Sequence, residues 1–219
     1  MKQFIKKIKS LNGRYTQAEI FNDFLTVSAN TLSNFHDFRF SKQRESESQI
    51  IFRKYNSEQQ HTFAELLAML MAKINQAIKN RELIDVFNQL FMDGFSDGDK
   101  GQFFTPLSVS QFMANTQVQH LINQPVIKQG EMSCGSGGMI IAFADNLMKY
   151  NVDYQTKLLV ECGDVDLRCV KMCYIQLYLY SIPARVMHRN ELAMDTYEEF
   201  TTFNYGLVKY ADNIQQSRT

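Results

Sequence analysis

Apolar residues in the first 95 positions recur with the spacing of α-helices. One face comprises Ile20, Phe21, Phe24, Leu25, Leu32 and Phe35, a second comprises Phe63, Leu66, Leu67, Leu70, Met71, Ile74 and Ile78, and a third comprises Ile84, Phe87, Leu90 and Phe91. Intervals of three and four residues place such side chains on one side of a helix. Ser57, with Gln60 three positions later, fits a capping box at the second helix. The polar residues 36–49 predict a loop or an exposed helix start. We therefore predict an all-helical N-terminal region over residues 1–95.

The pattern changes after a segment rich in turn-forming residues, Ser96-Asp97-Gly98-Asp99-Lys100-Gly101. We place a domain boundary there, so that the second domain spans residues 96–219. Thr105 and Pro106 then predict a helix start, with Thr105 as N-cap and Pro106 at the first helical position.

Beyond residue 124 the chain alternates between compact apolar runs and helical patterns. Strands are predicted at residues 125–133, 157–162 and 184–188, and helices at residues 139–150 and 167–180. Alternating strands and helices are typical of a parallel sheet whose strands are joined by crossover helices. The sequence therefore predicts an α/β fold with an incomplete parallel sheet behind the helical region.

A glycine-rich segment, Ser133-Cys134-Gly135-Ser136-Gly137-Gly138, joins the first predicted strand to its helix. Glycines allow a sharp turn and the close approach of a ligand, and the helix start presents free N–H groups. The spacing is not G-x-G-x-x-G, and no Lys-Ser/Thr pair follows as in a P-loop. The segment alone is consistent with a nucleotide-type binding loop or with a tight strand-to-helix turn.

An acidic segment at the end of the second predicted strand favours the binding loop. In open parallel sheets a ligand lies beyond the carboxyl ends of the strands, where an acid can accept hydrogen bonds from ribose hydroxyls. Asp164 has this position, while Asp166 suits the N-cap of the helix that begins at Leu167.

Composition narrows the function classes. The formal net charge is zero, which argues against a stand-alone, non-specific DNA-binding protein. The first 14 residues nevertheless carry five basic and no acidic side chains, which fits a solvated helix face or a phosphate-contacting arm. The chain has no apolar signal segment and no stretch approaching 18 apolar residues, so we expect neither a signal peptide nor a membrane span and predict a cytoplasmic protein.

The four cysteines are Cys134, Cys162, Cys169 and Cys173. They form no CxxC pair and have no histidine at zinc-finger spacing, so no metal is predicted. Cys169 and Cys173 share a helix face, which leaves a metal site as an alternative to reduced, buried thiols.

The segment Gly101-Gln102-Phe103-Phe104-Thr105-Pro106, followed by Cys134-Gly135-Ser136-Gly137-Gly138-Met139, resembles the N6-adenine DNA methyltransferase family. It is similar in particular to the modification subunits of type I restriction systems and to short plasmid- or phage-borne N-6 DNA methylase proteins. Residues 164–177 look like the second motif of the family and the helix after it. The resemblance covers about residues 85–195 and implies a Rossmann-like domain that binds S-adenosylmethionine (SAM).

The resemblance also implies a set of cofactor-binding residues. These are Thr105, Pro106, Glu131, Cys134, Gly135, Ser136, Gly137, Asp164 and Asn190. The helix start at Thr105 and Pro106 would lie beside the methionine end of SAM, which suits a helix N-terminus next to a carboxylate. The glycine loop would run under the cofactor, Asp164 would bind its ribose, and Asn190 would contact the adenine amino group.

Two departures from the family pattern affect the predicted activity. Glu131 and Met132 replace the usual Asp-Pro before the glycine loop. The Asn/Asp-Pro-Pro-Tyr/Phe motif, which holds the flipped target base, is missing, and no proline follows Pro183. The only local echo is Asn204-Tyr205-Gly206, so Asn204 and Tyr205 are the catalytic candidates.

Three functions remain open at this point. The first is a SAM-dependent adenine-N6 DNA methyltransferase, and the second is a catalytically inactive SAM- or DNA-binding module that acts as a regulator, antirestriction factor or subunit of a restriction-modification assembly. The third is a methyltransferase of RNA or protein. The expected partners are DNA, restriction-modification subunits, or a second copy bound through the N-terminal helices.

Overall fold

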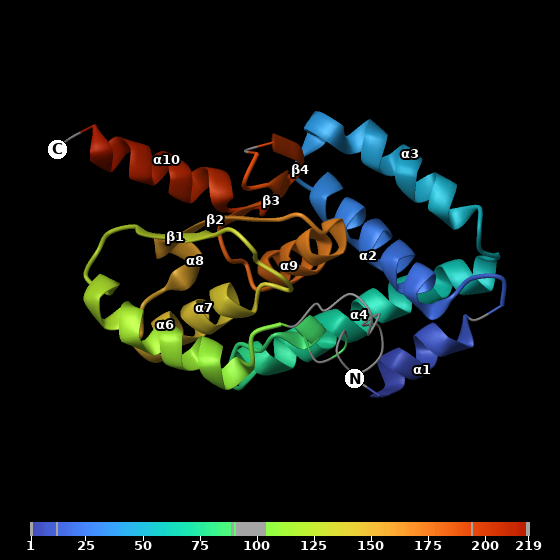
Figure 1. The fold of residues 1–219 in the computed structure, drawn as a ribbon, viewed down its shortest axis with the longest axis horizontal. Coiled ribbons are helices and arrows are strands. Elements are labelled where there is room, and N and C mark those ends of the chain that lie inside the picture. Colours follow the sequence, from blue (N-terminus) through green and yellow to red (C-terminus); the bar gives the residue numbers. More distant parts are fainter. Residues whose placement is uncertain (1, 12, 89, 91–103, 194, 218–219) are drawn as a thin grey trace.

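The structure is a computed structural model that describes residues 2–11, 13–88, 90, 104–193 and 195–217. It has a mixed α/β fold in which a helical N-terminal region packs beside a four-stranded sheet (Figure 1). The predicted fold class is confirmed. The predicted domain boundary at residues 96–101 lies outside the described residues, so the division there stays a prediction.

The N-terminal region is helical, as predicted. Its elements are α1 (Lys2–Ser10), α2 (Gln17–Asn34), the 3-10 helix η1 (Phe38–Phe40), α3 (Ser41–Phe52) and α4 (Ser57–Lys79). Helix α4 starts with a capping box between Asn56 and Gln59, one residue earlier than predicted. Of the two alternatives for residues 36–49, the structure has mainly helix, and Phe35 is exposed because α2 ends before it.

The sheet has the order β1-β2-β3-β4. Its strands are β1 (Ile127–Glu131), β2 (Leu158–Asp164), β3 (Ala184–Asn190) and β4 (Asp195–Thr201). The first three strands are parallel and form one half of a doubly wound sheet, whereas β4 pairs antiparallel with β3. The three parallel strands confirm the prediction, and the sequence analysis did not identify β4.

Helices connect and cover these strands. They are α6 (Leu107–Leu121), α7 (Gly138–Lys149), the short α8 (Tyr154–Lys157), α9 (Leu167–Leu179) and α10 (Tyr205–Gln216). Helix α6 begins at Leu107, with Pro106 at the N-cap and no side-chain cap bond, so the predicted capping by Thr105 is wrong by one residue. Helix α6 packs against α7, and α9 packs between the sheet and α2.

A single hydrophobic core runs through both parts of the chain. It joins aromatic residues of the N-terminal helices, such as Phe21 and Phe24, to the apolar side chains of α7, α9 and the sheet. In the described part of the chain, no helix combines the length and apolar character needed to cross a bilayer.

Candidate cofactor site

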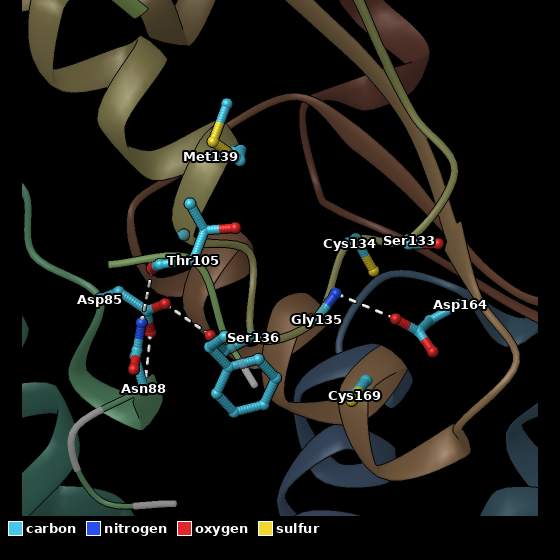
Figure 2. A pocket seen from close by; sticks show the side chains of 12 residues that line it. Asp85, Asn88, Thr105, Ser133, Cys134, Gly135, Ser136, Met139, Asp164 and Cys169 are labelled. Atoms are coloured by element: carbon cyan, nitrogen blue, oxygen red, sulfur yellow. Dashed lines mark hydrogen bonds between the residues drawn. The ribbon is translucent and has the colours of Figure 1, made fainter. Parts of the chain in front are cut away.

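A pocket of about 250 Å³ lies at the carboxyl ends of β1 and β2 (Figure 2). It is lined by Asp85, Asn88, Phe104, Thr105, Ser133, Cys134, Gly135, Ser136, Gly138, Met139, Asp164 and Cys169. Five of the nine predicted cofactor-binding residues are therefore brought together, from segments far apart in the sequence. Pro106, Glu131, Gly137 and Asn190 are not among the lining residues.

The glycine loop turns directly from β1 into α7. Gly137 has φ +96°, a left-handed conformation that favours glycine, and it forms the N-cap of α7 without a side-chain cap bond. A Cβ on Gly138 would lie 2.8 Å from Oδ2 of Asp85, so the absence of a side chain lets that carboxyl approach the helix start. The first N–H groups of α7 are left without intrahelical partners at the pocket wall, which favours an anionic or lone-pair-bearing ligand atom.

Asp164 holds the glycine loop in place. Its Oδ2 accepts a hydrogen bond from the Gly135 N–H at 3.0 Å (Figure 2). Its Oδ1 accepts one from the Asp166 N–H at 2.9 Å. A carboxylate oxygen has two lone pairs, so each oxygen can still accept a hydroxyl from a ligand. Asp166 caps α9 by accepting from the Arg168 N–H at 2.9 Å, which confirms its predicted role.

Asp85 is a pocket residue that the sequence analysis missed. Its Oδ2 accepts from the Ser136 hydroxyl at 2.5 Å, and its Oδ1 accepts from the Asn88 N–H at 2.9 Å (Figure 2). The same Oδ1 also accepts from Gln176 Nε2 at 2.9 Å. Burial raises the pKa of the Asp85 carboxyl above its usual range, although these hydrogen bonds act in the opposite direction. A second carboxyl group therefore faces the glycine loop from the N-terminal side of the chain.

Side chains of α7, of α9 and of Tyr180 at the C-cap of α9 fix the segment that carries Asp85. The Leu83 N–H donates to Asp145 at 2.7 Å, and the Val86 N–H donates to Gln176 Oε1 at 2.7 Å. Both backbone groups of Ile84 bond to the Tyr180 hydroxyl. We call residues 83–86 the strap. Because its backbone is held at each of these positions, the strap delivers Asp85 to the pocket in a defined orientation.

Only part of this arrangement had a signal in the sequence. Asp85 precedes a short helical segment at residues 86–88 and 90, which marks it as an N-cap type residue. Its contact with Ser136 crosses 51 positions, and no local pattern encodes it. Gln176 lies on α9 among mostly apolar residues, and no pattern in the sequence marks its fully buried amide.

Thr105 lines the pocket, and its carbonyl accepts from Asn88 Nδ2 at 3.2 Å. The helix start therefore lies beside the glycine loop, with Pro106 just behind it as the N-cap of α6, and its place beside the methionine end of SAM stays a prediction. Of the family-like segment, residues 101–103 lie outside the described part of the chain.

Glu131 ends β1 and has a long hydrogen bond, 3.4 Å, from the Ser133 N–H to its Oε1, so it acts on the start of the loop rather than in the pocket. At the end of β3, Asn190 Oδ1 accepts from the N–H groups of Leu192 and Ala193 at 3.1 and 3.2 Å. These bonds use both lone pairs of Oδ1, so in this conformation only the amide nitrogen remains for a ligand. The predicted contact with an adenine amino group cannot be made by this amide nitrogen, because both groups are donors.

The catalytic candidates Asn204 and Tyr205 lie away from the pocket, and Asn204 is at the amino-terminal ends of β2 and β3. Asn204 Nδ2 donates to the carbonyls of Gln155 and Ser181, which precede β2 and β3, at 2.9 and 2.8 Å. The Tyr205 hydroxyl donates to Glu161 Oε1 at 2.8 Å. The pocket is at the carboxyl ends of the same strands, so neither residue faces it, and the hypothesis that they hold a target base is wrong for this structure.

Comparison with known proteins identifies the family. The sequence model of the family described as N-6 DNA Methylase matches residues 79–208. The chain belongs to this family, and the match covers the strap, the pocket, all three parallel strands and β4.

A curated relative is the methylase subunit of the type I restriction enzyme EcoEI from Escherichia coli. It is 28% identical over 140 residues, which cover 58% of this chain and 28% of the relative. The chain therefore spans little more than a quarter of the length of this curated relative.

Two solved structures are similar at low identity. The methyltransferase subunit of a type I restriction-modification system from Streptococcus thermophilus has a TM-score of 0.43 and 11% identity. The aligned region covers 89% of this chain and 58% of that subunit. A candidate class I SAM-dependent methyltransferase from Listeria monocytogenes has a TM-score of 0.45 and 12% identity. The aligned region covers 85% of this chain and 52% of that protein. At these TM-scores the two structures do not indicate the chemistry of this chain.

Proposed function

We propose that this chain binds SAM in the pocket and serves in adenine-N6 methylation of DNA. The observation that carries the proposal is the bond from the Gly135 N–H to Asp164, which joins a glycine loop and an acid at the carboxyl ends of two parallel strands. Membership of the N-6 DNA Methylase family supplies the reaction class.

The chemistry of the pocket supports a cationic, ribose-bearing ligand. Bound SAM would supply a methyl group on a positively charged sulfur. The free lone pairs of Asp164 suit the two ribose hydroxyls, and the charge of this carboxylate favours a cation nearby. The enclosed volume, about 250 Å³, is below the roughly 300–1,000 Å³ of typical ligand pockets. We infer that the rest of the ligand extends along the strand ends toward Asn190, whose amide nitrogen suits a ring nitrogen of adenine.

Calorimetric titration with SAM tests the binding step. We expect Asp164→Asn to weaken binding about tenfold to a hundredfold, since a hydrogen bond to a charged group contributes about 1.5–3 kcal/mol. Asp153→Asn is the matched control, because Asp153 caps α8 just before β2, at the other end of the sheet. Circular dichroism checks that both variants fold. Absence of SAM binding, or equal weakening in both variants, would refute the proposed site.

Transfer of a labelled methyl group from SAM to DNA tests the reaction. The expected product is N6-methyladenine, together with S-adenosylhomocysteine and a released proton. SAM binding with background transfer on several DNAs would instead support the second candidate, a non-catalytic SAM-binding module. That candidate is favoured by one observation, the location of Asn204 and Tyr205 away from the pocket.

We also propose DNA and restriction-modification subunits as partners, since the relatives named above include subunits of such enzymes. The alternative of a homodimer through the N-terminal helices finds no support in the fold, because the apolar face of α2 is buried within the chain itself. Co-purification with the specificity or restriction subunit of the same system would test the proposed partners. Light scattering would measure the mass of the purified species and so distinguish such a complex from a homodimer.

A further inference from the structure

Three cysteines from three different elements converge beneath the glycine loop. Cys134 belongs to the loop after β1, Cys162 to β2 and Cys173 to α9. All three side chains are buried, and their sulfur atoms lie within 4.8 Å of one another. The Sγ atoms of Cys162 and Cys173 are 3.9 Å apart. The sequence left open a metal site at Cys169 and Cys173, which share a helix face. In the structure Cys173 lies beside Cys134 and Cys162 instead, and Cys169 is outside the cluster.

Hydrogen bonds hold the backbone around the three sulfurs. The Cys134 N–H donates to the carbonyl of Gly163 at 2.9 Å, and the Cys134 carbonyl accepts from the Gly137 N–H at 2.8 Å. Gly137 also makes room for the cluster, because a Cβ there would lie 3.2 Å from the sulfur of Cys173. The cluster is therefore held by the sheet, the loop and α9 together.

We propose that Cys134, Cys162 and Cys173 form a three-coordinate site for a soft, thiophilic metal ion, with Cu(I) as the expected occupant. A metal–sulfur distance of about 2.3 Å in a trigonal arrangement requires sulfur–sulfur distances of about 4.0 Å. Cys162 and Cys173 already have this separation, and the other two distances need to shorten by less than about 1 Å.

The number and type of ligands decide between metals. Thiolates select Cu(I), zinc and iron–sulfur clusters over hard cations. Zinc in structural sites is almost always four-coordinate. Among the residues that the structure describes, no histidine, aspartate, glutamate or fourth cysteine joins the three sulfurs. Zinc at this site would need water as its fourth ligand, and the three sulfurs are buried, so the site favours Cu(I) in a trigonal arrangement over zinc.

Titration of the reduced protein with Cu(I) under anaerobic conditions, against a chromophoric Cu(I) chelator, tests the site. We expect one equivalent to bind, and Cys162→Ala and Cys173→Ala each to weaken binding by more than about 100-fold, since even residues behind the ligands contribute 10–100-fold to metal affinity. Cys169→Ala is the matched control, because Cys169 is a buried cysteine on the same helix that is outside the cluster. Its affinity should equal that of the wild type.

X-ray absorption of the copper-loaded wild type keeps the test decisive if an alanine variant fails to fold. The expected spectrum has three sulfur neighbours at about 2.3 Å. Wild-type binding no tighter than that of Cys173→Ala, equal loss in Cys169→Ala, or a spectrum dominated by nitrogen or oxygen would overturn the proposal. Tighter binding of Zn(II) than of Cu(I), in a parallel competition, would overturn the assignment of the metal. SAM titration of the metal-free protein is independent of each of these outcomes.

Discussion

At the scale of single residues, the carboxyl group of Asp85 combines burial with hydrogen bonds that oppose its effect on the pKa. It accepts three hydrogen bonds, from Ser136, Gln176 and the Asn88 backbone, and still lies where burial raises its pKa. A raised pKa means that the folded state disfavours the charged carboxylate relative to the unfolded chain. Its charge state therefore links the stability of the fold to pH.

Asp85→Asn tests this link. The folded pKa of Asp85 is above the unfolded value of about 3.9, so its contribution to stability is fully present below about pH 4 and is lost as the pH rises through the folded pKa. Asparagine does not titrate and can keep one acceptor for the Asn88 N–H and a donor toward Ser136. We therefore expect the stability of the wild type, relative to the variant, to fall as the pH rises above about 4.

Urea unfolding of both proteins at several pH values between about 4 and 8 measures this difference. Asp195→Asn, at an exposed position of β4, controls for the general effect of removing one negative charge. A stability difference between wild type and Asp85→Asn that stays constant with pH would contradict the assignment.

At the scale of elements, periodic apolar patterns predicted the helices, and the polar strand at residues 125–133 was also predicted, whereas β4 was not. The helical faces at residues 20–32 and 63–78 became α2 and α4, because periodic apolar residues have one way to be buried together. The start of α4 was predicted one residue late because Asn56 and Ser57 are both good N-caps, and the local backbone selects between them. The polar strand β4 has no buried alternation and owes its position to pairing with β3.

The site shows the same division. The glycine loop and Asp164 could be predicted because each follows a strand whose end defines the position. The strap could not, because its backbone bonds are made to side chains 62 to 96 positions away. Sequence spacing also placed Cys173 with Cys169, whereas the packing of α9 on β2 places it beside Cys162.

Gln176→Leu tests whether the strap positions the loop. Gln176 accepts from the Val86 N–H and donates to Asp85 and to the carbonyl of Ser136. Leucine keeps most of the volume but removes the partner of the Val86 N–H and of the Ser136 carbonyl, at a cost of about 1–3 kcal/mol for each buried group, and takes one of three hydrogen bonds from Asp85. We expect a loss of several kcal/mol in urea unfolding, faster hydrogen exchange at the Val86 amide, and weaker SAM binding.

Gln76→Leu is the matched control, because Gln76 makes an exposed hydrogen bond to Asn80 on α4. Its stability should stay within about 0.5 kcal/mol of the wild type. A stable Gln176→Leu protein with unchanged exchange at Val86 would show that the apolar contacts of the strap suffice to hold it.

At the scale of the whole molecule, the N-terminal helices and the sheet meet through α2 and α9. Most of this junction is apolar, but it includes the buried amine of Lys171, which donates to the Thr26 hydroxyl at 2.9 Å. Glu47 of α3 lies 3.8 Å from the same amine, and the negative charges of Glu198 on β4 and Asp23 on α2 also act on it. Burial lowers the pKa of Lys171 against the influence of these acids. The contact between the helical region and the sheet therefore includes the charged amine of Lys171, whose burial costs free energy.

Lys171→Met tests how this junction is stabilised. Because the folded pKa of Lys171 is depressed below the unfolded value of about 10.4, its contribution to stability is present above that value and is lost as the pH falls through the folded pKa. Methionine fills a similar volume without a charge, and Glu47 stays half-exposed, so we expect the variant to be within about 1 kcal/mol of the wild type at pH 7. Between about pH 7 and pH 10, the free energy of unfolding of the wild type, measured with urea, should rise relative to that of the variant.

Lys73→Met, at an exposed position of α4, controls for loss of a positive charge. A large loss of stability at pH 7 would mean that the bonds of Lys171 outweigh its desolvation, and that the two parts of the chain depend on this polar contact to fold as one unit.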